Sequence, residues 1–252
     1  MKTILCIVAR SDSSRLPNKA LLKVINDINL LDLLILRLKT EFNKKQIVLA
    51  TTNSSNDNQL IDIAKKHGIM NYRGYKYNVL DRVINACSTI KECENIVRIT
   101  GDNPLTDPVV LKKMIESHEI NNSDYTFTKS IPVGTRAEVL SLKFLRFLSE
   151  NIINKNNTEY MTYYFQKKTG HKNNQFEFPF EKIKSGANLT VDTIQDFEFI
   201  KDIFTEINNK TYASLDEIIQ IVNSKKIIKK DSHISNRLIN LDDFNLKESN
   251  YG

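Results

Sequence analysis

Residues 3–19 read TILCIVARSDSSRLPNK, in which an apolar stretch rich in β-forming residues leads directly into a polar, positively charged one. The apolar part, residues 3–9, is short and bounded by polar residues, which indicates a buried strand that enters a loop. The loop holds three cations within ten residues, Arg10, Arg15 and Lys19. A buried strand that ends in such a loop is typical of ligand-binding α/β proteins.

The chemistry of this loop favours an anionic ligand with several oxygens. Hydroxyl groups of Ser11, Ser13 and Ser14, with backbone amides at a helix start, add donors to the cations. Together these groups suit a polyphosphate better than a single carboxylate. An ordinary solvated loop has the same composition, and neither a P-loop pattern nor a GxGxxG fingerprint is present to decide. The residues alone therefore leave both interpretations open.

The chain beyond this loop alternates between helical and strand patterns. The expected helices are 30–42, 57–67 and 79–90, and the expected strands are 46–51, 69–72 and 95–100. This alternation predicts an α/β fold with a mostly parallel central sheet and helices on both faces. The loops 10–19 and 101–107 then lie beyond the carboxyl ends of the strands, where such sheets bind ligands.

The second half of the chain has a less regular pattern. Its expected strands are 125–129, 136–140 and 189–191, and its expected helices are 109–118, 142–153, 159–168, 194–207 and 214–222. We expect one domain over residues 1–222, in which residues 120–190 form an inserted, acceptor-side region. The tail, residues 223–252, is polar, and its composition fits a packed arm as well as a partly disordered segment.

Composition argues against several classes of protein. The 252 residues are 40% hydrophobic and 26% charged, which suffices for one large core. No run approaches the roughly 20 apolar residues of a membrane helix, and residues 3–9 are too short for a signal peptide, so we expect a cytoplasmic protein without a membrane partner. The net charge of +6 accompanies abundant Lys, Asn and Ile. This pattern indicates an AT-rich coding bias rather than a nucleic-acid partner.

The cysteines and histidines do not form a metal-ligand pattern. Cys6, Cys87 and Cys93 are an odd number without a suitable spacing, and the four histidines are scattered along the chain. We therefore expect reduced, structural cysteines and no zinc site.

Carboxylates at strand ends suggest a different metal site. Asp102 follows the expected strand 95–100, and Asp192 follows another expected strand at the same sheet edge. Hard divalent cations prefer oxygen ligands and commonly combine one or two carboxylates with phosphate oxygens. Asp102 and Asp192 are therefore expected to hold Mg²⁺ together. Asp107 and Asp196 are expected to be structural caps at helix starts.

Six motifs stand in a fixed order along residues 9–200. They are ARSDSSRLPNK (9–19), ATTNSSNDNQL (50–60), YRGYKYNVLDR (72–82), VRITGDNPLTDP (97–108), PVGTRAEVLS (132–141) and LTVDTIQDFEFI (189–200). Together they resemble the cytidylyltransferase superfamily that includes CMP-sugar-acid synthetases, above all the branch typified by spore coat polysaccharide biosynthesis protein SpsF. One motif is weakly specific, whereas six collinear motifs over about residues 1–210 are strongly specific.

This resemblance implies a nucleotide-diphospho-sugar transferase (GT-A-like) fold and an enzyme that transfers CMP from CTP to a small acidic sugar, for surface polysaccharide or glycoconjugate synthesis. It implies that Arg10, Arg15 and Lys19 hold the triphosphate during catalysis, and that Asp102 and Asp192 hold Mg²⁺. The residues that it places beside CTP are Ala9, Arg10, Ser11, Arg15, Lys19, Thr51, Arg73, Asn78, Arg82, Thr100 and Gly101.

The resemblance also implies partners. Arg136 and Glu138 match a region that faces the acceptor, and a homodimer is implied whose second subunit borders that site, with residues 120–190 in the contact.

Some residues depart from the pattern of the superfamily. Asp12 and Asn18 stand where glycine is common, Asn78 where aspartate is usual, and Tyr160 where histidine is usual. Two alternatives therefore stay open. One is a nucleotidyltransferase with another nucleotide or with a phosphorylated or phosphonate non-sugar acceptor, and the other is a non-catalytic nucleotide-binding homologue.

Overall fold

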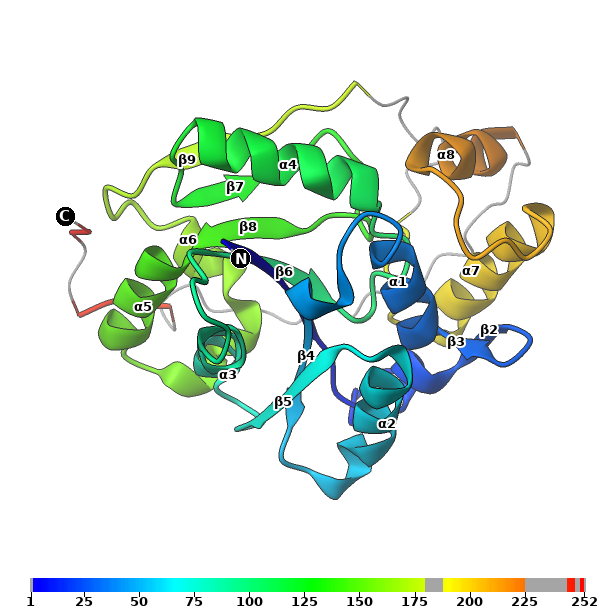
Figure 1. The fold of residues 1–252 in the computed structure, drawn as a ribbon, viewed down its shortest axis with the longest axis horizontal. Helices are drawn as coiled ribbons and strands as arrows, with labels where there is room; N and C mark the ends of the chain where they lie inside the picture. The colour runs from blue at the N-terminus through cyan, green and yellow to red at the C-terminus, as the bar shows by residue number, and fades with distance from the viewer. Residues whose placement is uncertain (1, 180–187, 225–243, 248–249, 252) are drawn as a thin grey trace.

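A seven-stranded sheet occupies the centre of the structure, a computed structural model that describes residues 2–179, 188–224, 244–247 and 250–251 (Figure 1). The strands lie in the order β5-β4-β1-β6-β8-β7-β9. Their bounds are β1 Thr3–Val8, β4 Ile47–Thr52, β5 Met70–Gly74, β6 Asn95–Thr100, β7 Tyr125–Phe127, β8 Glu138–Ser141 and β9 Asn173–Gln175. A separate hairpin consists of β2 (Lys23–Ile25) and β3 (Ile28–Asn29).

The half of the sheet built from β5, β4, β1 and β6 is parallel. Strand β1 pairs with β4 on one side and with β6 on the other, and β4 pairs with β5. Helix α1 (Leu30–Leu38) precedes β4, α2 (Asn58–His67) connects β4 to β5, and α3 (Val79–Ser88) connects β5 to β6. The carboxyl ends of these strands consequently meet at one edge, as the alternation in the sequence predicted.

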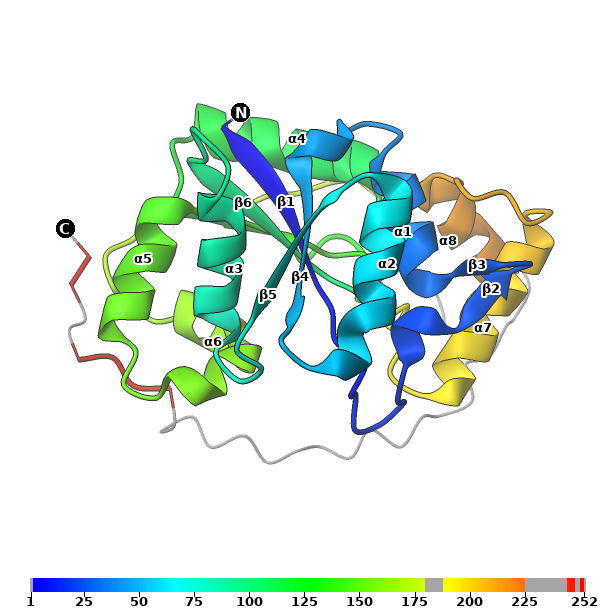
Figure 2. The same cartoon turned by 60° about the horizontal axis from the view of Figure 1, so that its bottom comes forward.

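The side chains of β1 show that both faces of the sheet are covered. Leu5 and Ile7 belong to an apolar cluster with α1, α2 and α4 (Pro108–Ile120). Ile4 and Cys6 belong to a second cluster with α3 and α5 (Leu142–Asn151). Alternate residues of a strand point to opposite faces, so helices pack on both sides of the sheet (Figure 2). The predicted mostly parallel sheet with helices on both faces is confirmed.

The other half of the sheet changes direction. Strand β8 runs antiparallel to β6, β7 antiparallel to β8, and β9 parallel to β7. Helices α7 (Ile194–Glu206) and α8 (Leu215–Ser224) pack with β2 in a third apolar cluster. No helix in the described ranges is both long and apolar enough to cross a membrane.

Some expectations about the second half were wrong in detail. Residues 189–191 do not form a strand, because Leu189 N–H donates to Val133 O and Val191 N–H donates to Asp102 O, which lie in loops. The expected helix 159–168 is broken into a 3-10 helix, Lys155–Tyr160, and the single turn α6, Thr162–Phe165. The strands β2, β3 and β9 were not predicted, since two or three residues are too few to show a strand period.

Part of the predicted polar tail packs against the helices beside α5. Phe244 is 2% exposed, and its ring lies 4.9 Å from the ring of Tyr163 and 5.2 Å from that of Tyr164, between centroids. Tyr251 donates through its hydroxyl to Asp124 at 2.8 Å. These described residues behave as an arm, while residues 225–243 of the tail lie outside the described residues.

Candidate active site

A cavity of about 580 Å³ opens beyond the carboxyl ends of β1 and β6. The first loop, residues 10–19, forms one of its walls and is called the basic loop below. The lining residues are Val8, Ala9, Arg10, Ser13, Ser14, Arg15, Lys19, Ala20, Val79, Arg82, Arg98, Thr100, Gly101, Asp102, Glu159, Tyr160 and Tyr163. The cavity thus collects residues from the two loops that the strand pattern placed at this edge, and adds a wall from residues 159–163.

Lys19 connects the two predicted metal ligands. Its Nζ donates to Asp102 Oδ2 at 2.7 Å, to Asp192 Oδ1 at 3.1 Å and to Val191 O at 2.8 Å. Arg15 lies at the same place, with a guanidinium nitrogen 2.8 Å from Asp192 Oδ1. Asp102 and Asp192, distant in sequence, therefore share one ammonium partner.

The donor set around Lys19 fits a divalent cation. Burial alone would raise the pKa of Asp102, but the charge and hydrogen bond of Lys19, together with hydrogen bonds from Thr100 and the backbone, outweigh burial, and the pKa of Asp102 lies below its ordinary value. Asp102 is therefore a carboxylate at neutral pH. In the described ranges no group of three or more His, Cys, Asp or Glu side chains could hold a metal ion. Two carboxylates suit an ion such as Mg²⁺, which takes its other oxygens from phosphates and water.

The floor of the cavity is formed where the backbone at Gly101 lies close to the backbone of Val8 and Ala9. The amide of Gly101 donates to Val8 O at 2.9 Å, and a Cβ at Gly101 would lie 2.8 Å from the Ala9 Cβ. A side chain at position 101 would thus push the basic loop away from β6. Asn18 has φ 56°, a left-handed conformation that asparagine tolerates better than most residues.

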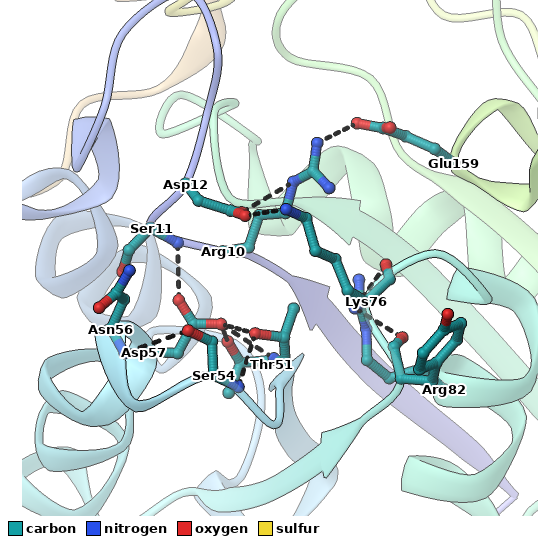
Figure 3. A network of polar contacts seen from close by, with 12 residues as sticks. Arg10, Ser11, Asp12, Thr51, Ser54, Asn56, Asp57, Lys76, Arg82 and Glu159 are labelled. Atoms are coloured by element: carbon teal, nitrogen blue, oxygen red, sulfur yellow. Dashed lines mark hydrogen bonds and ion pairs between the residues drawn. The ribbon is translucent and has the colours of Figure 1, made fainter. Parts of the chain in front are cut away.

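Arg10 reaches across the cavity to Glu159, in the 3-10 helix Lys155–Tyr160 (Figure 3). Its guanidinium lies 2.9 Å from Glu159 Oε1 and 3.5 Å from Asp12 Oδ1. Asp12 in turn pairs with Lys76. The carboxylate of Asp12 is therefore balanced by two cations. Glu159 is a cavity residue that no motif in the sequence indicated.

Arg82 is the most deeply buried cation of the cavity, with 2% exposure. Its guanidinium donates to the carbonyls of Tyr75 and Lys76, both at 3.3 Å. Its Nε has no hydrogen-bond partner among the described residues. Burial lowers the pKa of Arg82 from its ordinary value. A buried cation with an unused N–H can donate a hydrogen bond to an oxygen atom of a bound ligand.

Four predicted nucleotide residues do not line the cavity. The Ser11 amide and the Thr51 hydroxyl both bond to Asp57, each at 2.8 Å. Arg73 donates to Thr52 O, Ser54 O and Asn58 Oδ1, and so braces the loop after β4. Asn78 caps α3 by accepting from the Asp81 amide at 3.1 Å. In this structure these four residues support the walls of the cavity, Ser11 through its backbone amide and the other three through their side chains.

The two predicted helix caps are confirmed. Asp107 Oδ1 accepts from the amides of Val109 at 2.9 Å and Val110 at 3.1 Å. Asp196 Oδ2 accepts from the Thr193 amide at 2.8 Å and also from the Asp192 amide at 2.9 Å. The second cap therefore fixes the backbone that carries Asp192.

A second cavity of about 450 Å³ adjoins the first and shares Arg98 and Thr100 with it. Glu138 stands at the junction, where its carboxylate accepts from Arg98 at 2.6 Å, Tyr125 at 2.9 Å and Thr162 at 3.0 Å. The remaining lining residues are Asn103, Phe127, Thr128, Lys129, Arg136, Ala137 and Gln166. This cavity combines cations, amides and an aromatic wall, which suits a small polar anion.

A parallel sheet that presents a basic loop and the strand-end carboxylate Asp102 to one cavity, with Asp192 held on the same lysine, defines a nucleotide-binding enzyme of the α/β class. A sequence model described as cytidylyltransferase matches residues 4–233, and the chain belongs to this family. It is therefore a nucleotidyltransferase of a family that uses CTP, as the six motifs predicted.

Individual relatives agree with this assignment. The chain is 31% identical over 230 residues to spore coat polysaccharide biosynthesis protein SpsF of Bacillus subtilis, covering 88% of this chain and 95% of that protein. It is 29% identical over 176 residues to 3-deoxy-manno-octulosonate cytidylyltransferase of Psychromonas ingrahamii, covering 67% and 63%. The solved structure of a cytidylyltransferase from Leptospira borgpetersenii has a TM-score of 0.83 at 28% identity, covering 92% and 98%.

Proposed function

We propose that this enzyme transfers CMP from CTP to a small acidic sugar of the ulosonate or nonulosonate kind and releases pyrophosphate. The observation that carries the proposal is the pair of adjoining cavities. One is lined by the basic loop and Asp102, and the other holds Lys129 and Arg136. A triphosphate and a second, smaller anion would thus each meet cations, with the reacting atoms near the shared residues Arg98 and Thr100.

In this proposal the basic loop receives the triphosphate. The three cations of the loop, Arg10, Arg15 and Lys19, exchange their present carboxylate partners for phosphate oxygens. Arg82 donates a further hydrogen bond to the triphosphate through its Nε–H, which is unpaired among the described residues. Asp102 and Asp192 would hold Mg²⁺, which when bound neutralises charge on the phosphates. Fixed cations around a transferring phosphoryl group stabilise the transition state without reorganising at the moment of reaction.

The reaction is a displacement at the α-phosphorus of CTP. A hydroxyl oxygen of the acceptor attacks in line and gives up its proton to water. A bond forms between that oxygen and the α-phosphorus, and the bond from the α-phosphorus to the bridging oxygen of the β-phosphate breaks. Pyrophosphate leaves with that oxygen and its electron pair. Positioning and electrostatics supply most of the rate in reactions of this kind.

The acceptor would occupy the second cavity. Arg136 has a half-buried guanidinium whose Nε donates to Ile131 O at 2.9 Å, and burial lowers its pKa from the ordinary value. The Arg136 guanidinium, with Lys129 in the same cavity, can bind a carboxylate of the acceptor. Glu138 and Asn103 can form hydrogen bonds with sugar hydroxyls. The Psychromonas relative is named for an acidic sugar, and the Bacillus relative for polysaccharide biosynthesis, which supports an acidic sugar used for surface polysaccharide.

Arg136 and Lys129 also favour a second candidate, a phosphorylated or phosphonate acceptor that is not a sugar, because the same cations bind phosphate. The remaining alternative is a homologue without activity. The contacts relevant to it are those of Arg10, whose guanidinium is already paired with the carboxylates of Asp12 and Glu159.

We further propose that residues 1–222 act as one catalytic domain and that residues 120–190 contribute to a homodimer near the acceptor.

The test is pyrophosphate release with Mg²⁺ and each of CTP, UTP, ATP and GTP, against a panel of sugar acids, phosphosugars and phosphonates. We expect release with CTP and a sugar acid. Asp102→Asn is expected to lower that rate at least about 100-fold. Release with a phosphonate only would select the second candidate, and a protein that binds no CTP by calorimetry would contradict the proposal.

A further inference from the structure

Asp57 stands at the start of α2, yet its carboxylate does not cap that helix. Residues Ser55–Asp57 form a short 3-10 helix, whose own start is capped by the Ser54 hydroxyl. An aspartate at a helix start is ordinarily a cap, and the helix was expected from residue 57 onward. Because the Asp57 carboxylate does not cap the helix, its other contacts must determine its position.

The two oxygens of Asp57 bond to different segments of the chain (Figure 3). Oδ2 accepts from Thr51 Oγ1 at 2.8 Å, from the Thr52 amide at 3.0 Å, and also from the Thr52 hydroxyl. Oδ1 accepts from the Ser11 amide at 2.8 Å. Asp57 is 1% exposed, so water does not compete for these bonds. One oxygen is thus anchored at the end of β4, and the other holds the basic loop.

The entry of the basic loop is consequently held from two sides. Gly101 packs against Ala9 from the end of β6, and Asp57, which is anchored to the end of β4, holds the Ser11 amide. Arg10 lies between these two fixed residues. Its backbone position, and with it the direction in which its guanidinium enters the cavity, depends on both contacts.

From this geometry we propose that Asp57 is a positioning residue for CTP, because its grip on the Ser11 amide fixes the start of the basic loop. The inference rests on the proposed function, in which this loop holds the triphosphate. Asp57 itself does not line the cavity, so it acts through the backbone of Ser11 and Arg10.

The chemistry of Asp57 supports this role. Burial pushes its pKa upward, but hydrogen bonds from Thr52, Ser11 and Thr51 outweigh burial, and the pKa lies below its ordinary value. The group is therefore an anion at neutral pH. A carboxylate has acceptor sites on both oxygens, whereas an asparagine amide has one accepting oxygen and two donors.

Asp57→Asn is the direct test. Whichever way the amide is turned, its NH₂ faces a backbone N–H, either that of Ser11 or that of Thr52. We expect the Kd for CTP, measured by calorimetry, to rise at least about tenfold. We also expect the Ser11 amide to exchange its hydrogen faster in the nucleotide-free protein.

Asp32→Asn is the matched control. Asp32 is 2% exposed, and its carboxylate also accepts from several donors, the Asn29 amide, Lys66 and His67. Its substitution is expected to lower stability and to leave the Kd for CTP and the exchange at Ser11 unchanged. A purely structural role of Asp57 would make the two variants behave alike.

Each outcome decides the question. If a folded Asp57→Asn protein binds CTP as tightly as the wild type, the inference is overturned. If the wild type itself binds no CTP, the proposed function fails. If the Ser11 amide exchanges its hydrogen at the same rate in Asp57→Asn as in the wild type, Asp57 does not hold the loop, and the inference is overturned.

If the Asp57→Asn variant does not fold, Thr52→Val is the second test, because it removes one hydrogen bond to Asp57 with little change of shape. It is expected to weaken CTP binding severalfold, and an unchanged Kd overturns the inference.

Discussion

Lys19 has the most consequential side chain of the basic loop, since one ammonium meets two carboxylates and a carbonyl. Lys19→Met keeps the aliphatic stem and leaves Asp102 and Asp192 without this shared cation. We expect kcat/KM for pyrophosphate release from CTP to fall at least about 100-fold, because the triphosphate loses the same cation. Lys23→Met removes a surface lysine that is 65% exposed, and it should leave the rate unchanged. An equal loss in both variants would contradict the assignment.

Asp32 predicts how stability changes with pH. Burial pushes its pKa upward, but hydrogen bonds from His67, Lys66 and Asn29 outweigh burial, and the pKa lies below the ordinary 3.8. A carboxylate whose pKa is lowered by folding stabilises the protein above its unfolded pKa, and this stabilisation is lost as the pH falls through the folded value. Urea unfolding should therefore show that Asp32→Asn costs free energy at pH 7 and much less at strongly acidic pH. Asp62→Asn, at an exposed position of α2, should show little cost at either pH.

At the scale of elements, the segment around Phe244 supports the wall that carries Tyr163. Phe244 is nearly fully buried in the cluster that also contains α5 and α6. Phe244→Ala is expected to lower the free energy of unfolding by about 3–5 kcal/mol, because it leaves a cavity between aromatic rings. Phe244→Leu keeps most of the volume and should cost less than about 1.5 kcal/mol in the same urea titration. Equal costs would mean that the ring does not fill this space.

Elements with a long and regular pattern were predicted well. Strands β1, β4 and β6 and helices α2, α3 and α4 agree with the expected ranges to within a few residues, because each shows an uninterrupted apolar period. The second half was predicted less well. The segment 189–191 has the composition of a strand, but its bonds go to Val133 and Asp102 in loops, and only the tertiary structure determines these partners.

At the scale of the whole molecule, the parallel topology explains which site residues the sequence could reveal. Asp102 and the basic loop follow predicted strands, and the carboxyl ends of parallel strands share an edge, so their proximity was predictable. Asp57 and Glu159 were not found. Asp57 has the appearance of a helix cap, and Glu159 comes from a 3-10 helix whose approach to Arg10 depends on packing.

The position of Lys19 between two acids has a further consequence for handling the protein. Lys19 acts as an internal counter-ion, so the fold does not depend on a mineral ion to keep Asp102 and Asp192 together. We therefore expect a chelator to leave the melting temperature of the nucleotide-free protein unchanged. If Asp102 and Asp192 hold Mg²⁺ as proposed, free Mg²⁺ would have to compete with this tethered ammonium, whereas the phosphates of CTP would offer Lys19 another anionic partner. Under the proposed function, the cation and the nucleotide would therefore enter the site together.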